Sequence, residues 1–139
     1  MSDALWLFVG LPQWFFLNLL EPLAVVPLSV VPFIGIVCLA IGAVLGLRKR
    51  ARSLWKFALP VLASHVLVAV SGLFRGALDG SQVPAVVAVF LAIILGWSSL
   101  LVFKAKGSRL AAGFLALFTL SYAAFAAFIS GMSFTDTWL

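Results

Sequence analysis

Residues 48–56 read RKRARSLWK and separate two long apolar stretches, residues 23–47 and 57–74. Lys and Arg close to the ends of apolar spans remain on the cytoplasmic side of a membrane. We therefore predict that residues 48–56 form a cytoplasmic loop that sets the direction in which every other span crosses. The cations that form this anchor are Arg48, Lys49, Arg50, Arg52 and Lys56.

The composition indicates an integral membrane protein. The chain has 139 residues, of which 65% are hydrophobic and 9% are charged, and its mean hydropathy is +1.25. Such a chain lacks the polar surface of a soluble domain. A hydrocarbon core of about 30 Å takes roughly 20 apolar residues per helical crossing, so one membrane domain over residues 1–139 is expected.

Four apolar segments predict an all-α fold, a four-helix transmembrane bundle with crossings at residues 23–47, 57–74, 83–103 and 110–132. Lys104, Lys106 and Arg109 form a second basic loop two crossings after the first, and therefore on the same side. Of the nine cations, only Arg75 falls on the other side. This distribution predicts that both termini lie outside the cytoplasm, in a plasma membrane of the bacterial inner-membrane type.

The net charge of +5 has the same explanation. In a soluble protein it would suggest nucleic acid as a partner. Here the cations orient the spans and attract anionic lipid, so we expect membrane lipids and no nucleic acid as partners.

The N-terminal segment, residues 1–22, differs from the four spans. Its apolar part is interrupted by Gly10 and Pro12, and its many aromatic rings are typical of the membrane boundary. The acidic start lacks the basic region of a cleaved signal peptide. We predict an interfacial or re-entrant helix, with a short fifth crossing as the alternative. In the next span, Pro27 and Pro32 predict a bent or late helix start.

Small residues recur at steps of three and four in every span, which places them on single helix faces. Such faces let helices approach closely in lipid. The residues expected to pack helices are Gly35, Gly42, Gly46, Ala123, Ala127 and Gly131. A further stripe in the third span comprises Ala85, Ala88, Ala92, Gly96 and Ser99. These faces exceed what four helices need, which favours an additional partner helix or self-association. Phe114 and Phe118 allow acyl chains as an alternative.

His65 lies near the middle of the second span and is the only side chain in the spans that titrates near neutral pH. We predict a neutral imidazole hydrogen-bonded across the bundle, with headgroup, quinone or ion binding as the alternative. The candidate partners are Ser98, Ser99, Thr119, Ser121 and Tyr122. The chain has one histidine and one cysteine, Cys38, so we expect neither a metal nor a cofactor unless a homodimer pairs two copies of His65.

Motifs of hydrolases, kinases and zinc enzymes are absent from the sequence. We therefore expect a non-enzymatic membrane subunit or accessory protein that packs against partner membrane proteins and binds lipid or another hydrophobic ligand. The alternative is a small homo-oligomeric channel or transporter whose path passes near His65.

Overall fold

The structure is a computed structural model that describes residues 2–17, 26–48 and 52–137. These ranges contain helices and turns and no strand, and four helical segments are long and apolar enough to cross a membrane, as predicted. The elements are α1 (Ser2–Leu17), α2 (Val26–Arg48), the 3-10 helix η1 (Arg52–Phe57), α3 (Ala58–Leu73), α4 (Val83–Lys104) and α5 (Arg109–Thr135).

Prolines help to set where two of these helices begin. α2 begins at Val26, so Pro27 falls in its first turn. The N–H groups of the first turn have no acceptor within the helix, so a proline there breaks no hydrogen bond. Pro32 lies further inside the helix. α4 begins at Val83 and carries Pro84 in its first turn for the same reason. Pro22 and residues 23–25 of the predicted span lie outside the described residues.

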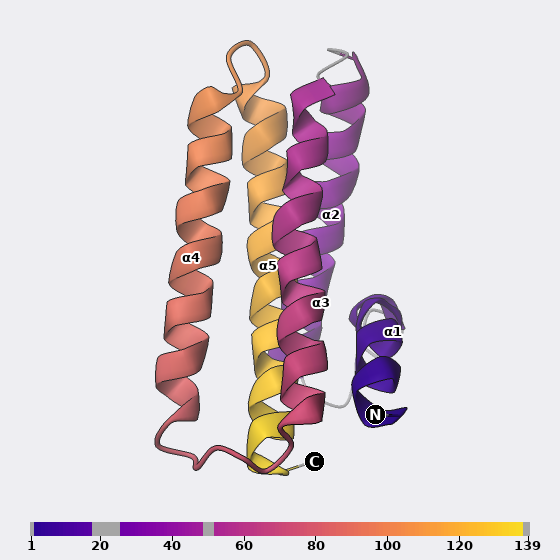
Figure 1. The fold of residues 1–139 in the computed structure, drawn as a ribbon. Coiled ribbons are helices and arrows are strands. Elements are labelled where there is room, and N and C mark those ends of the chain that lie inside the picture. Colours follow the sequence, from indigo (N-terminus) through magenta and orange to yellow (C-terminus); the bar gives the residue numbers. More distant parts are fainter. Residues whose placement is uncertain (1, 18–25, 49–51, 138–139) are drawn as a thin grey trace.

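α5 is the central helix of the bundle. α2, α3 and α4 each pack along it, and α3 and α4 barely touch one another (Figure 1). The share of residues buried is 56% in the apolar stretch of α5 but only 11% in that of α4. The bundle is therefore organised around one helix, with α4 attached at its side.

The two ends of the bundle carry different groups. The end of α2, η1 and the turn between α4 and α5 lie at one end, with Lys56 and Lys104 exposed there (Figure 1). The start of α1, the loop between α3 and α4 and the end of α5 lie at the other end (Figure 1). We call these the basic end and the opposite end.

The cations predicted as an anchor are only partly described. Arg48 closes α2, Arg52 opens η1 and Lys56 lies exposed within η1. Lys49 and Arg50 lie outside the described residues. The grouping of both basic loops at one end agrees with the predicted spans.

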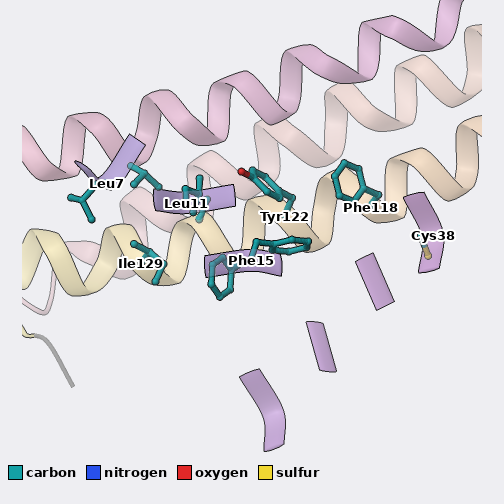
Figure 2. Close-up of a cluster of buried hydrophobic side chains, with 10 residues drawn as sticks. Leu7, Leu11, Phe15, Cys38, Phe118, Tyr122 and Ile129 are labelled. Atoms are coloured by element: carbon teal, nitrogen blue, oxygen red, sulfur yellow. The ribbon is translucent and has the colours of Figure 1, made fainter. Parts of the chain in front are cut away.

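α1 lies beside α3 in the half of the bundle next to the opposite end (Figure 1). Figure 2 shows Leu7, Leu11 and Phe15 along one face of α1, directed at the buried cluster around α5. All three side chains are almost fully buried. Residues 18–22 of the predicted N-terminal segment are outside the described part of the chain.

Candidate functional site: a histidine between three helices

His65 of α3 joins α1 and α5 through both of its ring nitrogens. Nδ1 lies 3.1 Å from the main-chain carbonyl oxygen of Phe8 in α1. Nε2 lies 3.0 Å from the hydroxyl oxygen of Tyr122 in α5. The ring of Phe8 also contacts the imidazole, with a centroid distance of 4.9 Å. One side chain therefore connects three helices.

The two partners determine which nitrogen carries the proton. A carbonyl oxygen can only accept, so Nδ1 must donate to Phe8. In a neutral imidazole Nε2 is then the acceptor, and the Tyr122 hydroxyl donates to it. Both bonds are satisfied by a single neutral tautomer of His65.

Aromatic side chains hold Tyr122 in place. Phe15 of α1 contacts the ring of Tyr122 at a centroid distance of 4.8 Å, and Phe118 contacts it at 5.9 Å. Phe125 completes the cluster by packing edge-on against Phe15 at 5.5 Å. Because Phe15 has no exposed surface, α1 and α5 meet here without solvent between them (Figure 2).

Of the five candidate partners of His65, the structure brings only Tyr122 to it. Ser98 of α4 and Thr119 of α5 form a separate pair at 3.2 Å. Thr119 donates its proton to the carbonyl of Ala116, so the Ser98 hydroxyl is the donor in that pair. Ser121 donates to the carbonyl of Leu117 within α5, and Ser99 lies half-buried on α4. These hydroxyls do not form one site with His65.

Sequence reasoning missed the main-chain acceptor, the carbonyl of Phe8. A search for side chains does not reveal a main-chain partner. The available signal was Pro12, four residues later, which has no N–H to donate to that carbonyl within α1.

The small residues of α2 and α5 lie inside the bundle. Gly35, Gly42 and Gly46 are buried, and a Cβ added at Gly42 would lie 2.9 Å from the side chain of Leu115. Ala123 and Ala127 are also buried; Gly131 is half-buried, and a Cβ there would lie 3.4 Å from Val83. These positions permit close approach of α5 to its neighbours.

The small residues of α4 point away from the bundle. α4 packs on α5 through the side that carries Ile94 and Ser98, which are buried. With 3.6 residues per turn, Ala85, Ala92 and Gly96 fall on the opposite side of the helix. All three are exposed, and a Cβ added at Gly96 would have nothing within 4 Å. We call residues Ala85, Ala88, Ala92 and Gly96, with the half-buried Ser99 at their edge, the outward small face of α4; the first four are exposed in the described chain.

Apolar grooves flank α4. The groove between α3 and α4 has a volume of about 500 Å³ and is lined by residues such as Leu62, Val66 and Phe90. A second groove of about 500 Å³ lies between α4 and α5, with Val87 and Phe128 in its wall. Both have predominantly hydrophobic walls. α4 thus packs against α5 and has an open apolar groove on each side of that contact.

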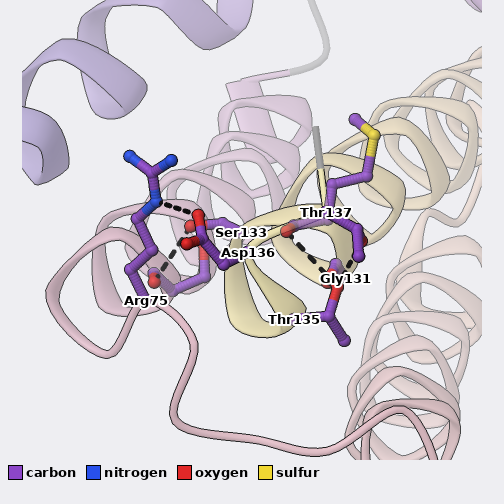
Figure 3. Close-up of polar contacts among 8 residues, drawn as sticks. Arg75, Gly131, Ser133, Thr135, Asp136 and Thr137 are labelled. Carbon is purple, nitrogen blue, oxygen red and sulfur yellow. Dashed lines mark hydrogen bonds and ion pairs between the residues drawn. The ribbon is translucent and has the colours of Figure 1, made fainter. Parts of the chain in front are cut away.

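The opposite end is closed by contacts between α5 and the loop after α3. Arg75 forms an ion pair with Asp136, and the N–H of Gly76 donates to the carbonyl of Ser133 over 3.2 Å (Figure 3). The Ser133 hydroxyl donates to the carbonyl of Ser71 over 3.0 Å. No local sequence pattern predicts these contacts, because the partners are far apart along the chain.

Within the described residues, no group of three or more His, Cys, Asp or Glu could hold a metal ion. Comparison with protein-family models, curated proteins and solved structures finds no match. The functional proposal therefore rests on the packing and chemistry of the chain.

Proposed function

We propose that this protein is a non-enzymatic accessory subunit of the membrane that binds a transmembrane helix of a partner protein through the outward small face of α4. The observation that carries the proposal is the contrast between the buried small residues of α2 and α5 and the exposed ones of α4.

The proposal places four crossings in a plasma membrane, with the basic end in the cytoplasm and both chain ends outside. The two basic loops support this orientation, because cations close to spans remain cytoplasmic. α2, η1 with α3, α4 and α5 provide the crossings. α1 enters from the outer side as a re-entrant helix.

A face of small residues has a specific use in lipid. Helices in a membrane gain little from the hydrophobic effect when they associate, because lipid tails are as apolar as their side chains. Close backbone approach and van der Waals packing provide the attraction instead, and small residues permit both. The outward small face runs over Ala85, Ala92 and Gly96, which is several helical turns. This length suits one partner helix crossing α4.

Lipid occupies the remaining surface of α4 in this proposal. The groove between α3 and α4 has bulky branched walls rather than small ones. Such walls fit mobile acyl chains, which follow an irregular surface without a fixed register. The partner helix and the lipids therefore use different sides of α4.

A channel or transporter path near His65 has less support. α5 fills the centre of the bundle, and both nitrogens of His65 are already hydrogen-bonded to protein. Neither of the two apolar grooves beside α4 includes His65 in its wall. These observations favour a structural role for the histidine.

The proposal is tested by native mass determination of the protein purified in a mild detergent. We expect the wild-type chain to carry a second membrane protein and Gly96→Leu to lose it, because the added side chain prevents close approach. Gly113→Leu is the matched control: Gly113 lies on α5, and a Cβ there also has nothing within 4 Å. This variant should retain the partner.

Two results would contradict the proposal. One is a wild-type chain that carries no second membrane protein and forms a homo-oligomer that moves solute across liposomes. The other is a partner retained equally by Gly96→Leu and Gly113→Leu.

A further inference from the structure

α1 reaches the middle of the bundle. Ala4 lies against Gly72, near the end of α3, where an added Cβ would be 2.9 Å from the Ala4 backbone. Eleven residues later in the sequence, Phe15 contacts Tyr122, which is the central residue of α5. α1 therefore runs from the opposite end of the bundle to about half its depth.

The same helix contains an incomplete hydrogen-bond ladder. In an α-helix each carbonyl accepts from the N–H four residues later. For Phe8 that residue is Pro12, which lies inside α1 and has no N–H. The carbonyl of Phe8 thus lacks its helical donor, and in the proposed membrane placement it lies within the apolar core. An unsatisfied carbonyl in hydrocarbon is costly.

His65 supplies the missing donor. Its Nδ1–H points to the carbonyl of Phe8, and Tyr122 occupies Nε2 from the other side. We propose that Pro12, Phe8 and His65 form a latch that holds α1 in the membrane. Pro12 leaves the carbonyl oxygen of Phe8 without its helical donor, and His65, held in one tautomer by Tyr122, donates a hydrogen bond to that oxygen.

The latch works with an uncharged ring. Among the described residues, His65 makes hydrogen bonds and ring contacts with the carbonyl and ring of Phe8 from α1 and with the hydroxyl and ring of Tyr122 from α5. Neither residue offers a counter-charge, and an unpaired cation inside the membrane is costly.

Close packing reinforces the latch at two positions of α1, Leu7 and Phe15. The side chain of Leu7 lies 2.7 Å from the position of a Cβ at Gly72, and that of Phe15 lies 2.9 Å from a Cβ at Gly35. Because Gly72 and Gly35 have no side chains, α1 can approach α3 and α2 closely. Packing therefore sets where α1 sits, and the bond from His65 holds its centre. This role is independent of the α4 interface and rests only on the membrane placement.

The test is a double-mutant cycle read by hydrogen exchange of the α1 amides, residues 4–17, in lipid nanodiscs. His65→Ala should accelerate exchange about three- to thirty-fold, the range expected for one intramembrane hydrogen bond. In Pro12→Ala, the new N–H at position 12 satisfies the Phe8 carbonyl. Adding His65→Ala to that background should change exchange less than about two-fold.

A conservative variant and a spectroscopic signature separate the latch from simple packing. His65→Asn should restore slow exchange, because its amide places a donor close to the position of Nδ1. In the wild-type protein, the nitrogen-15 NMR signals of His65 should show a protonated Nδ1 and an unprotonated Nε2. Tyr122→Phe should shift the population toward the other tautomer.

An equal effect of His65→Ala with and without Pro12 would overturn the latch, as would a proton on Nε2 in the wild-type ring. If His65→Ala fails to fold, the His65→Asn exchange and the NMR signals still decide the question. Neither measurement depends on a partner protein, so failure of the latch is distinguishable from failure of the α4 interface.

Discussion

α4 and α5 are similar in hydropathy and in their stripes of small residues, yet α5 is buried at the centre of the bundle and α4 is mostly exposed. Both are apolar helices with stripes of small residues, and both are long enough to cross a membrane. The buried share is 56% for the α5 stretch and 11% for that of α4. A stripe of small residues thus predicts close approach to a helix without saying whether that helix is in the same chain.

Glycines inside and outside the bundle give the largest expected difference. Gly42→Leu should lower the free energy of unfolding by about 2 kcal/mol or more, because a Cβ there lies 2.9 Å from Leu115 and 3.2 Å from the Ala111 carbonyl oxygen. Gly96→Leu should change it by less than about 0.5 kcal/mol, since nothing lies within 4 Å. Unfolding in mixed detergent micelles measures both.

An equal change in the free energy of unfolding for Gly42→Leu and Gly96→Leu would contradict the contrast between the two helix faces. Equal loss would mean that the face of α4 carrying Gly96 is packed inside the fold. Equal tolerance would mean that Leu115 moves aside and that α2 and α5 are not closely fitted.

A smaller difference is expected between two buried serines of α5. Ser133 donates to the carbonyl of Ser71 in α3, whereas the Ser130 hydroxyl is buried with no hydrogen-bond partner in the described chain. Ser133→Ala should cost about 0.6–1 kcal/mol, in the range of membrane hydrogen bonds. Ser130→Ala should be neutral or slightly stabilising, because it removes an unsatisfied polar group.

The same unfolding assay measures both serine variants. Equal destabilisation by the two substitutions would show that Ser130 also has a partner. The contact between α3 and α5 would then depend on both hydroxyls.

Hydropathy and charge predicted the helices and the grouping of the basic loops, because both are local properties of the chain. The predicted ranges 83–103 and 110–132 end within a few residues of α4 and α5. Where each helix sits was not predictable from these patterns. The central position of α5 depends on which faces meet in three dimensions, and apolar faces toward lipid and toward protein look alike in sequence.

The candidate site was predictable only in part. An isolated histidine in a span needs a polar partner, so the candidates were few and included Tyr122. The choice among them required the depth of each residue in the bundle. The carbonyl of Phe8 was not predicted as a partner because every residue has a carbonyl. Only Pro12, which has no N–H to donate to it within α1, distinguishes this carbonyl from the others.

The most direct test of the α4 interface is photocrosslinking in intact membranes. A photoreactive side chain at Val89, beside the outward small face of α4 and 61% exposed, is compared with one at Val44, on α2 and 51% exposed. We expect the probe at Val89 to crosslink to a partner membrane protein and the probe at Val44 to crosslink to lipid. Crosslinks from Val89 to lipid alone, or the same protein captured from both positions, would contradict the proposed interface.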